Sequence, residues 1–292
     1  MQQSINLWIK GARPRTLPAA IAPVLVGASC ARLDNAESAI FINSFFALIV
    51  SLALQVAVNY ANDYSDGVRG TDKQRVGPLR LVGSGAKSAA AVKRAAFLCF
   101  GVAAIFGLVL AATTTWWLIA VGVACFAAGW FYTGGSKPYG YFGFGELFVF
   151  IFFGVVATTG TTFVVIQKIT RASLISSIAV GCLACALLVI NNLRDIPGDT
   201  IAGKKTLAVR LGDRRTRQIY VALLAVSAVA IVVLSLDNPF ALLGLIGLLA
   251  AIPAIRQVNQ GATGKDLIAV LGTTGRTQML TAVTLSIGIL LA

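Results

Sequence analysis

Ile40-Phe-Ile-Asn-Ser-Phe-Phe-Ala-Leu-Ile-Val-Ser-Leu-Ala-Leu-Gln-Val-Ala-Val-Asn-Tyr-Ala-Asn62 is a mostly apolar stretch without a charged residue, and Asp63-Tyr-Ser-Asp66 follows it directly. As a helix rising about 1.5 Å per residue, it is long enough to cross the roughly 30 Å hydrocarbon core of a bilayer. The sequence predicts an all-α protein, a polytopic membrane bundle of about nine transmembrane helices. The predicted crossings lie near residues 17–33, 40–62, 94–112, 115–133, 142–166, 173–193, 218–236, 239–256 and 275–292.

The composition supports a membrane protein and argues against a nucleic-acid partner. Hydrophobic residues make up 57% of the chain and charged residues only 12%, whereas soluble domains carry about 25% charged residues. A net charge of +13 would suggest nucleic-acid binding in a soluble protein. Here the basic residues lie mostly in loops between apolar stretches, where they set the membrane orientation, so no nucleic-acid partner is expected.

Two acidic clusters stand at corresponding ends of apolar stretches. The second, Asn191-Asn-Leu-Arg-Asp195-Ile-Pro-Gly-Asp199, follows the first by 132 residues when Asp63 is matched with Asp195. Each cluster leads into a long polar loop, 63–93 or 194–217, and long loops in compact proteins are usually functional. We therefore predict one domain, residues 1–292, built from two related halves around a central cavity. The halves are approximately 1–140 and 141–292.

Basic residues concentrate in alternate loops, which predicts the orientation in the membrane. The loops between them, which would lie on the opposite side of the membrane, carry only Arg32, Lys168 and Arg171 as basic residues. By the positive-inside rule we expect a multi-pass protein of the cell membrane, with its N-terminus inside and its C-terminus outside. Both acidic clusters then face the cytoplasm. Residues 1–10 are predicted to form a short amphipathic helix at the membrane interface.

The acidic clusters have the donor chemistry of a magnesium site. Asn59, Asp63 and Asp66 fall at i, i+4 and i+7 of a helix and share one face. The chain contains no histidine, and hard oxygen ligands suit Mg²⁺, which binds through one or two carboxylates together with substrate phosphates. The alternative is helix capping, which explains one Asp or Asn at each end but not Asn59 and Asp63 beside an apolar helix.

Other polar residues near these clusters are candidates for ligand contact. Arg80 stands between Gly77-Pro-Leu and Gly83-Ser-Gly85, where a flexible backbone and a planar guanidinium suit an anion. Tyr132 and Lys137 lie at a cytoplasmic mouth and are candidates to orient an aromatic acid, with an interfacial aromatic belt as the alternative. Glu146 lies within an apolar stretch and is a functional candidate, or else a partner of Arg276 or Lys137.

These motifs resemble the UbiA superfamily of intramembrane aromatic prenyltransferases. That family carries an Asn-Asp-x-x-Asp-type motif after its second helix and an Asp-x-x-x-Asp motif after its sixth, in a bundle of nine helices. The matches here are Asn62-Asp63-x-x-Asp66 and Asp195-x-x-x-Asp199. Gly77-Pro-Leu-Arg80 and Asn191-Asn-Leu-Arg-Asp195 are most similar to the menaquinone-pathway branch. The usual tyrosine-to-lysine motif is stretched, because Lys137 stands five positions after Tyr132.

The resemblance implies transfer of a polyprenyl group from polyprenyl diphosphate to 1,4-dihydroxy-2-naphthoate, with loss of CO₂, to give demethylmenaquinone. Mg²⁺ is the implied cofactor, and the lipid bilayer is the implied surroundings. We expect the metal ligands to be Asp63, Asp66, Asp72, Asp195 and Asp199, supported by Asn59 and Asn62. The diphosphate contacts are expected to be Lys73, Arg80, Lys204, Lys205 and Arg210, and the residues that orient the acceptor are expected to be Tyr132 and Lys137.

Two alternatives remain open on the sequence. A UbiA-type enzyme with another acceptor, such as 4-hydroxybenzoate, haem, chlorophyllide or homogentisate, would carry the same paired motifs. A secondary transporter would also use acidic residues in the membrane and an internal repeat. Because the polar residues concentrate on one side of the predicted bundle, the transporter is disfavoured.

Overall fold

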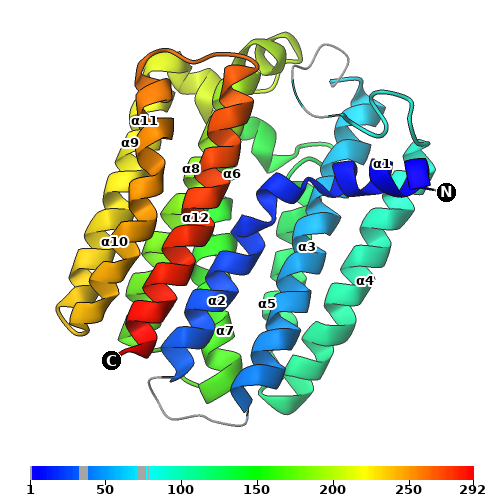
Figure 1. Ribbon diagram of the computed structural model, residues 1–292. Helices are drawn as coiled ribbons and strands as arrows, with labels where there is room; N and C mark the ends of the chain where they lie inside the picture. Colours follow the sequence, from blue (N-terminus) through cyan, green and yellow to red (C-terminus); the bar gives the residue numbers. More distant parts are fainter. Residues whose placement is uncertain (1, 33–38, 72–76, 78) are drawn as a thin grey trace.

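The computed structural model describes residues 2–32, 39–71, 77 and 79–292, and in these ranges it is helical without strands. The helices lie side by side in one bundle, and α1 runs across one end of it (Figure 1). In a bilayer, helices satisfy their own backbone hydrogen bonds, which explains why long apolar stretches of this sequence adopt this form. The prediction of an all-α membrane bundle is confirmed.

Five α-helices lie in the described part of the first half of the chain. Helix α3 carries the first acidic cluster at its end, and α1 precedes the bundle as a short amphipathic helix that ends next to a tight 3₁₀ turn, η1 (Pro14–Thr16). The remaining connections in this half are short, except for the one between α3 and α4. The bounds are α1 Gln2–Ala12, α2 Pro18–Arg32, α3 Ala39–Arg69, α4 Ala89–Thr113 and α5 Trp117–Phe131.

The second half is more irregular. A 3₁₀ turn, η2, leads into α6, and a π-helical segment, η3, joins α6 to α7. A second composite helix runs from η4 through α10 and η5 to α11. Helix α9 contains a break at Gly212, whose φ is 76°. The bounds are η2 Tyr139–Phe142, α6 Gly145–Val149, η3 Phe150–Val156, α7 Ala157–Ile166, α8 Arg171–Ile201, α9 Leu207–Ser235, η4 Pro239–Leu242, α10 Leu243–Leu248, η5 Leu249–Ala251, α11 Ile252–Asn259 and α12 Asp266–Leu290.

Six helical rods in the described ranges are long and apolar enough to cross a membrane. Two further apolar helices, α2 and α5, have 15 residues each, and the final helix α12 has 25 residues but is less apolar. The protein is therefore an integral membrane protein, and the count of nine crossings stays a prediction. Arg276 lies within α12 rather than at its start, with its side chain exposed.

Helix α8 forms the centre of the second half and carries the second acidic cluster. It packs against α9, α12, α7 and α2, and its apolar side chains join those of α9 and α12 in a buried core. A Cβ atom added at Gly154 of η3 would lie 2.6 Å from the Cα of Gly181 in α8. Small residues allow backbones to approach closely in membrane bundles, where packing holds the helices together. This packing fixes the rotation of α8 and thereby which of its polar residues face inward.

Candidate active site

A cavity of about 880 Å³ lies inside the bundle and is polar at one end and apolar over the rest. Its polar end is formed where α3 and α8 finish, so residues far apart in the sequence meet there. Its walls come from both halves of the chain, with α3 and α5 on one side and α6, η3, α7 and α8 on the other. The polar wall includes Asn62, Asp66, Arg80, Asn191, Arg194, Asp195, Asp199 and Lys204.

Asp66 is the acidic residue that α3 presents to this cavity. Its side chain is almost completely buried, and Oδ1 accepts a hydrogen bond of 2.6 Å from the hydroxyl of Tyr141. Oδ2 lies 3.2 Å from the ammonium of Lys204 and 3.9 Å from the guanidinium of Arg80. Asn62, one turn earlier, accepts a 2.7 Å hydrogen bond from Thr133. A buried carboxylate needs partners of this kind, and two of them are cations.

Helix α8 presents Asp195 and Asp199 to the same space. The guanidinium of Arg194 binds both carboxylate oxygens of Asp195 at 2.8 Å and also donates to Asn191 Oδ1 at 2.8 Å. Pro197 stands inside α8 between the two acids, and a proline cannot donate the usual helical hydrogen bond, so the backbone is loosened there. A Cβ added at Gly77 would lie 3.4 Å from Arg194 Cζ, which brings the loop after α3 against the second motif.

Lys204 joins the two acidic clusters. Its ammonium lies 3.2 Å from Asp66 Oδ2 and 3.7 Å from Asp199 Oδ1, and it is buried to nine-tenths. It also lies 4.8 Å from the centre of the Tyr141 ring, a cation–π distance. One cation thus bridges carboxylates that are more than 130 positions apart in the sequence.

The position of Lys204 bears on whether a metal ion fits here. An ammonium between two carboxylates marks a place where positive charge is stable, and the surrounding donors are hard oxygens of the kind that Mg²⁺ prefers. Within the described part of the chain, no group of three or more Asp, Glu, Cys or His side chains forms a metal site by itself. Mg²⁺ usually binds through one or two carboxylates and completes its coordination with water and substrate phosphates. Asp66 and Asp199, which share Lys204, fit such an ion, whereas both oxygens of Asp195 are bound by Arg194.

Tyr141 in η2 belongs to the site although its sequence context gave no signal of it. Its hydroxyl donates to Asp66, and the guanidinium of Arg69 lies 5.3 Å from its ring centre. Burial, and then the negative charge of Asp66, raises the pKa of Tyr141 above its ordinary value. The hydroxyl therefore remains a hydrogen-bond donor at physiological pH.

Asp63 lies elsewhere than the metal prediction implied. It is buried, does not line the cavity, and its two carboxylate oxygens accept hydrogen bonds from the backbone N–H groups of Leu81 and Val82, at 2.8 and 2.9 Å. The cavity face of α3 carries Asn59, Asn62 and Asp66 instead. Neighbouring helical positions differ by about 100° around the axis, so Asp63 points toward the following loop when Asn62 points inward.

Several other predicted contacts lie outside the cavity wall. Lys137, Lys205 and Arg210 are exposed and do not line it. Arg210 donates to the Lys205 carbonyl at 3.1 Å and packs along Gly143. Lys137 and Lys205 lie in loops and Arg210 in the first turn of α9, all on the outer surface, whereas Lys204 is the buried lysine of this region. The predicted sites at Asp72 and Lys73 fall outside the described residues.

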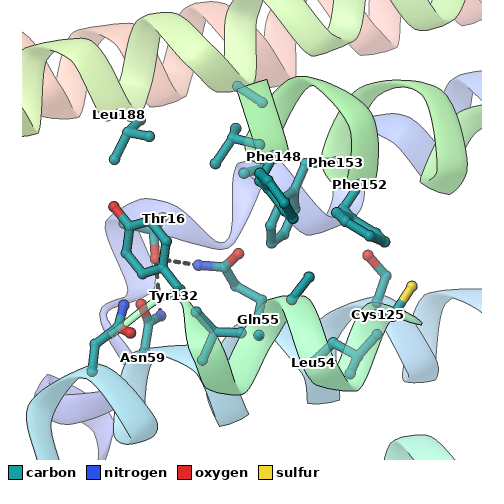
Figure 2. A pocket seen from close by; sticks show the side chains of 18 of the residues that line it. Thr16, Leu54, Gln55, Asn59, Cys125, Tyr132, Phe148, Phe152, Phe153 and Leu188 are labelled. Carbon is teal, nitrogen blue, oxygen red and sulfur yellow. Dashed lines mark hydrogen bonds between the residues drawn. The ribbon is translucent and has the colours of Figure 1, made fainter. Parts of the chain in front are cut away.

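Asn59 lies on the cavity wall and is held by the N-terminal segment. Its amide donates to the Ala12 carbonyl at 2.9 Å and to the Thr16 hydroxyl at 3.1 Å, and Gln55 donates to the same hydroxyl (Figure 2). The segment that contains Thr16 also brings Arg13 and Arg15 to the cavity wall. No local pattern around these two arginines indicates a ligand site, and only the fold reveals that they reach the cavity.

Tyr132 lines the cavity near Leu188 (Figure 2). A Cβ added to Gly145 would lie 3.4 Å from the Tyr132 hydroxyl, so Tyr132 borders the start of α6. The next residue, Glu146, accepts a 2.9 Å hydrogen bond from Asn192 of the cavity wall. Its polar partner is thus Asn192, while Arg276 and Lys137 are both exposed.

The rest of the cavity is apolar. Figure 2 shows Phe148, Phe152 and Phe153 directed toward the pocket, with Leu54 and Cys125 across from them. The π-helical segment places Phe152 and Phe153 consecutively on this wall, and such segments often occur at functional sites. Glycines and alanines of α4, α5 and α7 line its far part. A long apolar chain with an anionic end matches this division.

Comparison with known proteins agrees with this geometry. The sequence pattern of the UbiA prenyltransferase family matches residues 20–275, most of the chain. Proteins named 1,4-dihydroxy-2-naphthoate octaprenyltransferase are similar over most of their length. The protein from Mycobacterium tuberculosis is 51% identical over 93% of this chain and 92% of its own. The one from Escherichia coli is 36% identical over 81% of this chain and 79% of its own.

Solved structures share the fold at low sequence identity. The apo structure of a UbiA homolog from Aeropyrum pernix K1 has a TM-score of 0.70 at 14% identity and covers 94% of this chain and 97% of its own. A UbiA homolog from Archaeoglobus fulgidus bound to DMAPP and Mg²⁺ has a TM-score of 0.63 at 15% identity. It covers 98% of this chain and 99% of its own.

Proposed function

This chain belongs to the UbiA prenyltransferase family, and from that premise we propose that it transfers a polyprenyl group from polyprenyl diphosphate to 1,4-dihydroxy-2-naphthoate in menaquinone synthesis. The allylic C–O bond breaks and its electron pair leaves with diphosphate. The electron-rich ring forms the new C–C bond, and its carboxylate departs as CO₂. The product is demethylmenaquinone in its hydroquinone form.

One observation carries the proposal: Lys204 lies within 4 Å of both Asp66 and Asp199 at the polar end of an apolar cavity. A site that ionises an allylic diphosphate has to stabilise the leaving diphosphate and exclude water from the carbocation. Carboxylates and cations are concentrated at one end of this cavity, and phenylalanines line the other part. A single continuous space thus offers both environments.

Positive side chains at the polar end would bind the leaving diphosphate. Among the described residues, Lys204 and Arg80 are the buried cations that lie within 4 Å of Asp66, and Arg194 is held by Asp195 and Asn191. Charge-assisted hydrogen bonds from such groups are about twice as strong as neutral ones, and an arginine guanidinium can donate two parallel hydrogen bonds to a phosphate group. Because these residues are already buried and oriented, they need little rearrangement when charge develops on the diphosphate.

Asp66 and Asp199 are the residues that we propose hold Mg²⁺, with Asn62 and Asn191 as neutral oxygen donors beside them. When bound, the ion supplies positive charge that stabilises the departing diphosphate. Tyr141 keeps one oxygen of Asp66 in a fixed direction through its 2.6 Å hydrogen bond. Lys204 already places positive charge beside Asp66 and Asp199 and would share the stabilisation of the diphosphate with such an ion.

The acceptor is proposed to bind between the polar and apolar parts, near Tyr132 and Asn192. Tyr132 borders the cavity next to α6, and Glu146 fixes the side-chain amide of Asn192. Arg13 and Arg15 on the cavity wall offer positive charge to the naphthoate carboxylate. We further propose that this end of the cavity faces the cytoplasm of the cell membrane, because the loops around it carry most of the basic residues.

The test is turnover by purified protein in lipid nanodiscs with octaprenyl diphosphate, 1,4-dihydroxy-2-naphthoate and Mg²⁺, followed by mass spectrometry of the product and measurement of diphosphate and CO₂. We expect the hydroquinone of demethylmenaquinone, formed more slowly by Asp66→Asn and by Asp199→Asn at the same Mg²⁺ concentration. A parallel reaction with 4-hydroxybenzoate distinguishes the acceptors. Preferential prenylation of 4-hydroxybenzoate would refute the acceptor assignment, and full activity in EDTA would refute the metal assignment.

A further inference from the structure

The carboxylate of Asp63 accepts hydrogen bonds from backbone amides and does not line the cavity. Its Oδ2 accepts from Leu81 N–H at 2.8 Å and its Oδ1 from Val82 N–H at 2.9 Å, and its side chain is 1% exposed. Bonds from two consecutive amides to a charged carboxylate form a strong clasp. The clasp spans the connection between α3 and α4, since the bonded residues lie 18 and 19 positions apart.

Side-chain packing reinforces the clasp on the same face of α3. Gly67 follows Asp63 by one helical turn, and a Cβ added there would lie 2.5 Å from Cβ and Cγ1 of Val82. Leu81 is fully buried and touches α1, because a Cβ added at Gly11 would lie 2.6 Å from Leu81 Cδ1. Both glycines allow the loop to approach α3 and α1 closely.

Helix α1 is itself held on this face of α3. The Tyr60 hydroxyl donates to the Trp8 carbonyl at 2.9 Å, and the two rings pack edge to face with centroids 5.6 Å apart. Tyr60, Asp63 and Gly67 fall at i, i+3 and i+7, so one stripe of α3 binds α1 and the loop. The neighbouring stripe, with Asn62 and Asp66, faces the cavity.

Arg80 is the residue immediately before the clasped amides. Its side chain is 9% exposed, it lines the cavity, and its guanidinium lies 3.9 Å from Asp66 Oδ2. The loop after it is closed by its own backbone bonds, from Ser84 N–H to the Arg80 carbonyl at 3.1 Å and from Lys87 N–H to the Leu81 carbonyl at 2.9 Å. The direction of Arg80 therefore depends on where the Leu81–Val82 backbone is held.

We propose that Asp63 is a positioning residue that fixes the Leu81–Val82 backbone so that Arg80 faces the diphosphate end of the cavity, and that it does not bind the metal ion. The proposal rests on the proposed function, because it assigns Arg80 to the diphosphate. It divides the first acidic motif into two roles. Asp66 lines the cavity and contacts its polar residues, whereas Asp63, on the adjacent stripe of α3, holds the loop backbone.

The principal test is Asp63→Asn in the full-length protein in nanodiscs, compared with Asp66→Asn. An asparagine keeps one acceptor oxygen but turns an N–H₂ group toward a backbone N–H. We expect KM for the prenyl diphosphate to rise about tenfold or more, with a smaller change in kcat. The Mg²⁺ concentration for half-maximal activity should stay within about twofold of wild type, whereas Asp66→Asn should raise it. An equal rise in both variants would overturn the proposal, because it would make Asp63 a metal ligand.

A double-mutant comparison tests whether Asp63 acts through Arg80. If it does, Asp63→Asn should change KM by less than about twofold when Arg80 is already Ala, because the effects of residues that act as a unit do not add. Multiplication of the two single effects would overturn the proposal. Gly67→Ala pushes the Val82 side chain away from α3, one helical turn from Asp63, and should reproduce the KM increase, which keeps the proposal testable if Asp63→Asn folds poorly.

Hydrogen exchange supplies a readout that does not need turnover. Peptides covering residues 79–87 should exchange faster in Asp63→Asn, while those of α8 keep wild-type protection. Unchanged exchange at 79–87 would contradict the clasp. If wild-type protein exchanged as expected but produced no demethylmenaquinone, the proposed function would fail while the loop clasp stood.

Discussion

Lys204 offers the sharpest test of how the two acidic clusters cooperate. Its ammonium lies 3.2 Å from Asp66 and 3.7 Å from Asp199 and is nine-tenths buried. Replacement by Met keeps the length of the stem and removes the charge. A hydrogen bond to a charged group contributes about 1.5–3 kcal/mol, so the loss of one such bond to diphosphate should raise KM for the prenyl donor about 10- to 100-fold.

The same substitution should act in the opposite direction on the metal. Without the ammonium, Asp66 and Asp199 lose the positive charge that Lys204 places beside both of them, which would favour a divalent ion at these carboxylates. At an effective dielectric constant of about 20, two unit charges about 4 Å apart interact by about 4 kcal/mol, so loss of the ammonium beside these carboxylates is large enough to shift the Mg²⁺ requirement. We therefore expect Lys204→Met to reach half-maximal activity at a lower Mg²⁺ concentration than wild type.

The assay is initial-rate kinetics in nanodiscs, with the prenyl diphosphate and Mg²⁺ varied independently. Lys205→Met is the matched comparison, because Lys205 is the adjacent residue but is exposed and away from the cavity wall. It should change KM by less than about threefold, which is the range of surface substitutions. A larger effect at Lys205 than at Lys204, or a rise in both KM and the Mg²⁺ requirement at Lys204, would refute this reasoning.

Three further predictions follow from the cavity and its polar end. Tyr141→Phe removes the 2.6 Å hydrogen bond to Asp66 and should lower kcat/KM about tenfold. Because burial raises the pKa of Tyr141, its hydroxyl stays neutral, and the ratio of mutant to wild-type kcat/KM should be constant from about pH 6 to 9. The contribution of this hydrogen bond is lost only above the raised pKa. Gly160→Leu adds a side chain to the apolar part of the cavity, where no neighbouring atom lies within 4 Å of an added Cβ. It should slow transfer from octaprenyl diphosphate more than tenfold, while transfer from geranyl diphosphate changes less than threefold. Equal slowing with both donors would contradict a binding site for the isoprenoid tail there. Removal of divalent ions with EDTA should abolish product formation, and Mg²⁺ should restore it; product at the wild-type rate in EDTA would contradict the metal assignment.

The helices and the class of chemistry could be read from the sequence because both depend on local properties. Uncharged apolar stretches of bilayer length leave the backbone no alternative to a helix, whatever their neighbours are. The acidic clusters at the ends of two such stretches, in a chain with few acids, indicated a cation and an anionic substrate. The family comparison agrees with that prediction.

The choice between adjacent residues depended on tertiary packing. Asp63 and Asp66 belong to one motif, but rotation of α3 directs only Asp66 to the cavity, and that rotation is set by contacts of Tyr60 and Gly67 with α1 and the loop. Lys204 and Lys205 are neighbours in sequence, yet only Lys204 is buried between the acids. Such contacts join positions far apart in the chain, and no local pattern records them.

The sequence by itself determined a membrane-spanning helical bundle with two acidic helix ends, because hydropathy and helix length act within each segment. Only the tertiary structure decided that Tyr141, Arg13 and Arg15 reach the cavity and that Asp63 binds the loop backbone. The physical reason is that the directions of successive side chains differ by about 100° around the helix axis. Whether it meets substrate, loop or lipid is therefore fixed by the packing of the whole bundle.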